Sequence, residues 1–235
     1  MSSLLKNKDV YLLGQGINDS TQNYGLSLQT IKKYQQTKLI DTPIAEESVT
    51  GVILGMSLTG IYPILTHLRM DFSLLSLNQL LNHFSKYKYM YGGQFNPSAL
   101  IRMIVGRSWG QGAQHAQSLQ STFSHFPGVE VILPSNSSEL IEFYNYAYKA
   151  KKGLVISIEH RNLFELHFPL TLQKSFKNNK PPWLPKIIQH GKSITIVATS
   201  IMIIESLRAA DFLKQHFQIE CEIISIGSTT NLDIS

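Results

Sequence analysis

Apolar positions along the chain alternate between short continuous runs and longer segments with helical spacing. The short runs predict strands at 10–13, 62–67, 99–105, 129–134 and 153–159. Between them, apolar residues spaced for one face of a helix predict helices at 26–34, 50–58, 72–89, 118–125 and 137–150. Alternating strands and helices are typical of an α/β fold, in which a mostly parallel sheet is flanked by helices.

A change of composition separates the last part of the chain from the first. Residues 171–190 carry Pro181, Pro182 and Pro185 among lysines and predict a linker. Strands at 193–199 and 220–226 are then predicted on either side of a helix at 201–216. We therefore expect a first domain over 1–170 and a partial C-terminal α/β domain over 191–235, because one strand–helix–strand unit cannot cover its own sheet.

Composition and charge restrict the class of protein. With 43% hydrophobic and 16% charged residues, the 235-residue chain has the composition of a globular protein with a core. The net charge of +5 is spread over small lysine groups and forms no nucleic-acid-binding stripe. A lone Cys221, no leader-like N-terminus and no apolar stretch of membrane-spanning length predict a cytoplasmic protein without a membrane partner.

Candidate chemistry lies in residues 41–46, which read Asp-Thr-Pro-Ile-Ala-Glu. Glu46 comes just before an uncharged apolar run at 49–61. Beside such a wall, a carboxyl group is either kept protonated by desolvation or held by a hydrogen-bonding partner, and both arrangements can make it a proton switch. The plainer alternative is an acid that caps a helix N-terminus.

Five segments together resemble the β subunits of thiamine-diphosphate-dependent 2-oxo acid dehydrogenases. They are DTPIAE at 41–46, THLRMDF at 66–72, NHFSKYKYMYGGQ at 82–94, RMIVGRSWGQGAQHAQS at 102–118 and FPGVEVILP at 126–134. Each segment alone is a weak signal, but five in the family's order and spacing are specific. The resemblance implies a transketolase-like pyrimidine-binding domain and, from about residue 191, the start of the family's C-terminal domain.

The resemblance also implies roles for single residues. Glu46 matches the glutamate that hydrogen-bonds to the pyrimidine ring nitrogen of thiamine diphosphate and favours its imino tautomer, with Glu47 as the neighbouring competitor. Phe72 matches the aromatic residue that stacks on the pyrimidine, and a core phenylalanine is the alternative. His115 matches a histidine at the mouth of the active site that positions the substrate or moves protons, against the alternative of a structural or exposed histidine.

The chain departs from the family pattern in two places. Gln15 stands where many members carry a glutamate close to the cofactor, and an amide keeps hydrogen bonds but cannot exchange a proton. The family's C-terminal domain also continues for several more elements than the sequence contains. Both departures leave open a non-catalytic, truncated homologue.

The resemblance implies that this chain does not build the active site alone. The family's α subunit supplies the Gly-Asp-Gly motif that holds the diphosphate and magnesium, and this sequence has no such motif and no other magnesium-like carboxylate cluster. We therefore expect an α-type partner in a heterotetramer with β–β contacts, and a lipoyl acyltransferase as a further partner. The implied activity is oxidative decarboxylation of a 2-oxo acid, and the alternative is the small subunit of a split transketolase.

We expect mainly structural roles for the other polar residues of the motifs. His67, His125 and His160 are expected to make structural hydrogen bonds, although His67 and Arg69 could lie near the cofactor. Three further residues, Arg102, Arg107 and Trp109, are expected to form a packed turn.

Overall fold

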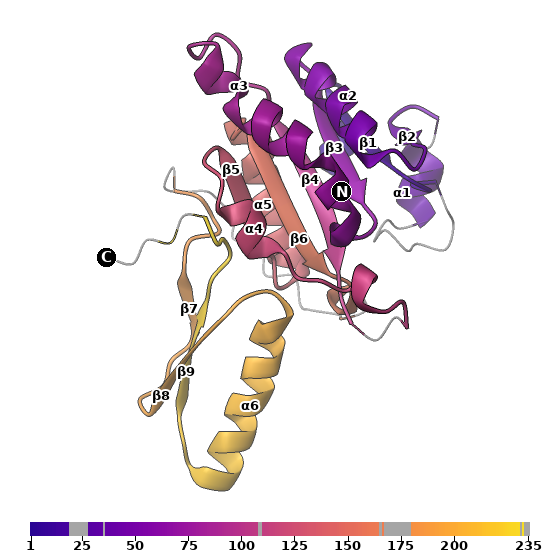
Figure 1. The fold of residues 1–235 in the computed structure, drawn as a ribbon. Coiled ribbons are helices and arrows are strands. Elements are labelled where there is room, and N and C mark those ends of the chain that lie inside the picture. Colours follow the sequence, from indigo (N-terminus) through magenta and orange to yellow (C-terminus); the bar gives the residue numbers. More distant parts are fainter. Residues whose placement is uncertain are drawn as a thin grey trace.

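The computed structural model describes residues 1–18, 28–34, 36–107, 110–164, 166, 180–230 and 232. Within these residues the strands form two sheets (Figure 1). The larger sheet has six strands in the order β2-β1-β3-β4-β6-β5, and all of its pairs are parallel. The smaller sheet has three strands in the order β7-β9-β8. The predicted α/β fold with a mostly parallel sheet is therefore confirmed.

Continuous apolar runs form the centre of the larger sheet, as expected for strands that are covered on both faces. Its strands are β1 (Val10–Gly14), β2 (Leu39–Asp41), β3 (Tyr62–His67), β4 (Ala99–Val105), β5 (Val129–Ile132) and β6 (Leu154–His160). Every residue of β3 and β4 is buried, and both strands have the predicted bounds. The sequence did not predict β2, because three residues are too few to show a pattern.

Helices cover both faces of the larger sheet. One face carries α2 (Glu46–Leu58), η2 (Met70–Ser76), η3 (Asn78–Phe84), α3 (Ser85–Met90) and α4 (Gln120–Ser124). The other face carries η1 (Leu4–Lys6), α1 (Leu28–Tyr34) and α5 (Ser137–Ala150). The predicted helix at 72–89 is helical throughout but changes pitch, from a 3₁₀ turn in η2 through a π-helix in η3 to the α-helix α3.

The ends of α5 show why its prediction was accurate. The Asn136 side chain caps the helix by accepting a hydrogen bond from the Glu139 amide at 2.9 Å. The helix ends at Lys151, whose left-handed conformation (φ 45°) turns the chain toward β6.

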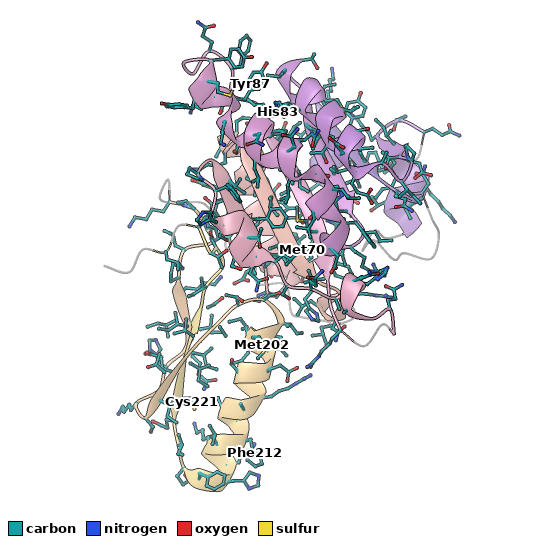
Figure 2. The ribbon with its side chains drawn as sticks, viewed as in Figure 1. Met70, His83, Tyr87, Met202, Phe212 and Cys221 are labelled. Atoms are coloured by element: carbon teal, nitrogen blue, oxygen red, sulfur yellow. The ribbon has the colours of Figure 1, made fainter. Side chains whose placement is uncertain are left out.

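The second domain is a small sheet with a helix on one face. Its elements are β7 (Lys186–Gln189), β8 (Ile194–Ala198), α6 (Ile201–Phe217) and β9 (Cys221–Ser225). Cys221, the first residue of β9, is buried against α6, whereas Met202 and Phe212, toward opposite ends of α6, are more than half exposed (Figure 2). Strand β7 lies within the stretch indicated as a linker, residues 171–190, of which 171–179 lie outside the described residues.

Backbone pairing joins the two domains. An antiparallel bridge links Ile132 at the end of β5 to Ser228, and the Leu133 amide donates to the Gly227 carbonyl at 2.8 Å. A Cβ atom on Gly227 would lie 2.8 Å from the Phe143 ring, so only glycine fits there. Trp183 is fully buried at this junction, edge-on to Phe143. The free edge of β5 is thus covered by the second domain.

Arg102 corrects one expectation, because it lies inside β4 and not in a turn. Its Nε and Nη2 donate to the two carboxylate oxygens of Glu159 on β6, at 2.8 and 2.6 Å, and Tyr144 of α5 also donates to Glu159. Both charged side chains are almost completely buried. Burial alone would lower the pKa of the Arg102 guanidinium, but the adjacent Glu159 carboxylate outweighs burial and raises that pKa.

We predict that Arg102→Met lowers the free energy of unfolding by about 3–5 kcal/mol, because it leaves the Glu159 carboxylate buried without its counter-charge. Urea denaturation measures the loss. The double variant Arg102→Met/Glu159→Leu should recover most of it, since an apolar pair replaces the ion pair. Arg208→Met, which removes an exposed ion pair to Glu205, is the control and should cost less than about 1 kcal/mol. A double variant as unstable as the single one would contradict the prediction.

Candidate functional site

The strands of the larger sheet end together at one edge, which we call the carboxyl edge. The arrowheads of its central strands lie at the same end of the sheet (Figure 1). In open parallel sheets, ligands bind where the strands end. All four predicted site residues lie on segments that follow this edge: Gln15 follows β1, Glu46 follows β2, Phe72 follows β3 and His115 follows β4.

Gln15 and Glu46 line one small hollow at the carboxyl edge, with a volume of about 20 Å³. Its other lining residues are Thr42, Pro43, Val49, Leu65, Thr66, His67 and Leu68. The loop after β1 is held against the end of β2, because the Gly16 amide donates to the Asp41 carboxylate at 2.6 Å. We refer to this space as the Glu46 hollow.

Glu46 is the first residue of α2 and is half-buried. Its backbone carbonyl accepts a hydrogen bond from the Thr50 hydroxyl at 2.7 Å. Among the described residues, its carboxylate has no hydrogen-bond partner. The competitor Glu47 is exposed and accepts a hydrogen bond from Gln79 Nε2 at 2.9 Å. Of the two acids, Glu46 is therefore the one that lines the hollow, and its carboxylate remains available to a ligand.

Phe72 and His115 contact each other although they lie 43 positions apart in the sequence. Their rings meet edge to face, with centroids 5.1 Å apart and planes at 86°. Phe72 is 37% exposed, so it is not an ordinary core residue. The pair presents one apolar and one titratable ring at the carboxyl edge.

Two polar contacts fasten the loop that carries His115 to the segment that carries Phe72. Arg69 donates from Nε and Nη2 to Gln111 Oε1, at 3.0 and 2.8 Å. Asp71 Oδ1 accepts hydrogen bonds from the Gln117 amide and from Gln117 Nε2, at 3.2 and 2.8 Å. The long sequence motif at 102–118 thus folds back onto the motif at 66–72.

His67 differs from its expected structural role. It is 4% exposed, lines the Glu46 hollow, and its Nε2 atom has no hydrogen-bond partner among the described residues. Burial lowers the pKa of His67 to about 4, so its ring is neutral at pH 7. A histidine at the end of a strand looks ordinary in the sequence. Only the packing of α2 against β3 shows that His67 lines the hollow.

The remaining motif residues lie outside this arrangement. His160 Nδ1 accepts a hydrogen bond from the Asn162 amide at 3.3 Å, and burial together with the Arg107 charge lowers its pKa. Arg107 is exposed and lies 3.9 Å from Glu205 of α6. Trp109 lies outside the described residues. Among the described residues there is no cluster of three or more potential metal ligands, and no helix is long and apolar enough to cross a membrane.

Comparison with known families agrees with the fold. Residues 2–165 match the family model "Transketolase, pyrimidine binding domain", and residues 185–235 match "Transketolase, C-terminal domain". The chain therefore belongs to the transketolase family of pyrimidine-binding domains, in the group that contains the β subunits of the pyruvate dehydrogenase E1 component.

Individual relatives show how far the similarity extends. The chain is 31% identical over 225 residues to the mitochondrial pyruvate dehydrogenase E1 subunit β of Ascaris suum, with 95% of this chain and 62% of that protein covered. It is 30% identical over 233 residues to the corresponding subunit of Cyanidium caldarium, covering 97% and 68%. The chain spans about three-fifths of the length of the first relatives that it matches.

A solved structure shares the fold. The structure titled "Split gene transketolase, inactive beta4 tetramer" superposes with a TM-score of 0.65 at 19% identity, covering 97% of this chain and 69% of that one.

We predict that Asp71→Ala loosens the loop that carries His115. A hydrogen bond to a charged acceptor contributes about 1.5–3 kcal/mol, so amide exchange at Gln117 should speed up by about tenfold or more. Hydrogen–deuterium exchange measures this effect, and Asp211→Ala on the exposed side of α6 is the control. An unchanged Gln117 exchange rate would show that the contact does not hold the loop.

Proposed function

We propose that the chain is a β-type subunit that forms a thiamine-diphosphate active site together with an α-type subunit. The assembled enzyme oxidatively decarboxylates a 2-oxo acid and transfers the acyl group to a lipoyl group. The observation that supports this most is the available Glu46 carboxylate in a hollow at the carboxyl edge. The Phe72–His115 pair also lies at this edge.

The residues fit the heterocycle of this cofactor. Glu46 offers a carboxyl group to a ring nitrogen and holds or releases the proton there. Phe72 offers an exposed aromatic ring for stacking. Gln15 offers hydrogen bonds but no proton. When bound, thiamine diphosphate supplies the electron sink for the loss of carbon dioxide.

His115 fits the substrate side of the site. Its ring is packed against Phe72 by an edge-to-face contact and is half-exposed. From there the imidazole would orient the carboxylate of the 2-oxo acid or move a proton. The Arg69–Gln111 and Asp71–Gln117 contacts would hold it in place.

The site needs a second polypeptide. A hollow of about 20 Å³ has room for little more than one water molecule, so most of a cofactor would have to lie outside it. The magnesium ion that accompanies the diphosphate requires oxygen ligands. The described residues contain no cluster of three or more potential metal ligands, so the partner would supply them. An α-type subunit would bring these ligands.

Exposed apolar side chains beside the site mark a surface for this partner. Ile44 lies just before α2, and Val52 lies on it. Leu75 lies on η2, which packs against α2. Further exposed residues lie away from the site, at the end of α3 and on the loop that leads to the start of β4: Tyr89, Met90, Tyr91 and Phe95. Gathered apolar residues of this kind are typical of protein interfaces.

Co-expression with an α-type subunit tests the proposal. We expect a stable complex that binds thiamine diphosphate with magnesium, releases carbon dioxide from a 2-oxo acid and acylates a lipoyl domain. A panel of straight and branched 2-oxo acids would identify the substrate. Ketol transfer between sugars would instead assign a split transketolase, and a stable complex without cofactor binding would refute the proposal.

We predict that Glu46→Gln abolishes activation of the bound cofactor while the complex still assembles. An amide cannot exchange a proton with the ring, so deuterium exchange at the thiazolium carbon should slow by about 10²–10⁴-fold. Glu47→Gln is the matched control, because Glu47 contacts Gln79 and does not line the hollow. Exchange at the wild-type rate in Glu46→Gln would refute the assigned role.

We predict that Phe72→Ala weakens cofactor binding by about 1–3 kcal/mol, on the scale of one aromatic stacking contact. Isothermal titration of the complex with thiamine diphosphate measures the change. Phe212→Ala, which removes an exposed ring from α6 in the second domain, is the control. Equal affinities for Phe72→Ala and wild type would exclude stacking on this residue.

A further inference from the structure

The side chain of His67 faces α2. In a strand, alternate residues point to the same side. Leu65 packs in the core between the sheet and α2, whereas Ile64 packs in the core on the other face. His67, two residues after Leu65, therefore lies on the α2 side, and it is the last residue of β3. His67 therefore lines the Glu46 hollow from the side of the sheet that α2 covers.

Two polar side chains of this hollow lack partners. His67 Nε2 is buried and lacks a hydrogen bond within the described part of the chain. The Glu46 carboxylate likewise has no partner there. Because buried polar groups in folded proteins are almost always hydrogen-bonded, such a group points to an occupant.

One water molecule fits as that occupant. A cavity needs about 10–15 Å³ and two to four polar neighbours to hold a water. The Glu46 hollow has about 20 Å³, with His67, Glu46, Thr66 and Gln15 among its lining residues.

The charge state of His67 suits this arrangement. Burial lowers its pKa to about 4, so at neutral pH the ring is uncharged. The other titratable groups on elements packed against the end of β3 are Glu46 and Glu47 of α2, Asp71 of η2 and Arg102 of β4, which is paired with Glu159. Glu47 and Asp71 are hydrogen-bonded to Gln79 and Gln117, respectively. Of these three acids, Glu46 is therefore the one whose carboxylate has no partner among the described residues. A neutral imidazole can orient that carboxyl group without fixing it as a carboxylate.

We propose that His67 is a positioning residue for Glu46: through one water in the shared hollow, His67 Nε2 hydrogen-bonds to the Glu46 carboxyl group and orients it toward the heterocycle. The catalytic part of this inference rests on the proposed function. The pairing itself does not, because both residues belong to this chain.

The pairing is tested on the full chain without cofactor. ¹⁵N NMR of the His67 ring at neutral pH should show a changed Nε2 signal in Glu46→Gln and an unchanged one in Glu47→Gln. If Glu46→Gln leaves the His67 signal unchanged, the pairing is overturned whatever the complex does. If the signals respond but the complex binds no thiamine diphosphate, the pairing holds and the proposed function fails.

The positioning role is tested in the complex with the α-type subunit. His67→Phe should slow deuterium exchange at the thiazolium carbon by about tenfold, the scale of one hydrogen bond, with little change in cofactor affinity. His67→Asn, which keeps a polar side chain, should restore part of the rate. In Glu46→Gln, adding His67→Phe should cause no further loss. Additive losses, or equal rates in His67→Phe and wild type, would overturn the role.

Discussion

The parallel order of the central strands is the constraint on which the rest of the molecule depends. Because β1, β3 and β4 run the same way, the segments that leave them emerge at one edge of the sheet. Helices cover both faces, so that edge is where polar side chains can gather beside apolar walls. Two tight features maintain the arrangement. At Gly14, a Cβ atom would lie 3.1 Å from the Thr66 carbonyl oxygen, and at the centre of the sheet β4 and β6 are joined by the Arg102–Glu159 ion pair.

The environment of Glu46 is polar but carries little charge. Gln15, Thr66 and the neutral His67 line the hollow that this acid shares, and none of the three carries a charge. Lysine or arginine in such a place would hold the acid as a carboxylate, whereas a purely apolar wall would favour the protonated form. The lining of the Glu46 hollow therefore offers hydrogen bonds without a counter-charge, which suits the proton exchange proposed for this acid.

Local pattern was enough to predict most elements but not the contacts that shape the site. Strands β3 and β4 and helix α5 have the predicted bounds, because long apolar runs and a capping asparagine mark them. Single-residue roles came from the family resemblance and still await direct tests. The sequence gives no hint that Arg102 is buried against Glu159, because 57 positions separate the two partners. Likewise, the availability of His67 Nε2 depends on which elements pack over β3, which periodicity does not encode.

The junction around Trp183 has a mechanical consequence. Backbone hydrogen bonds join β5 to the second domain. Gly227 lies so close to the Phe143 ring that a larger side chain would not fit there. Lys186 adds a 2.7 Å ion pair to the buried Glu139 of α5. These contacts couple the second domain to the edge strand and to a helix of the larger sheet. A force that a neighbouring molecule applies to the second domain would therefore reach β5 and the sheet that supports the candidate site.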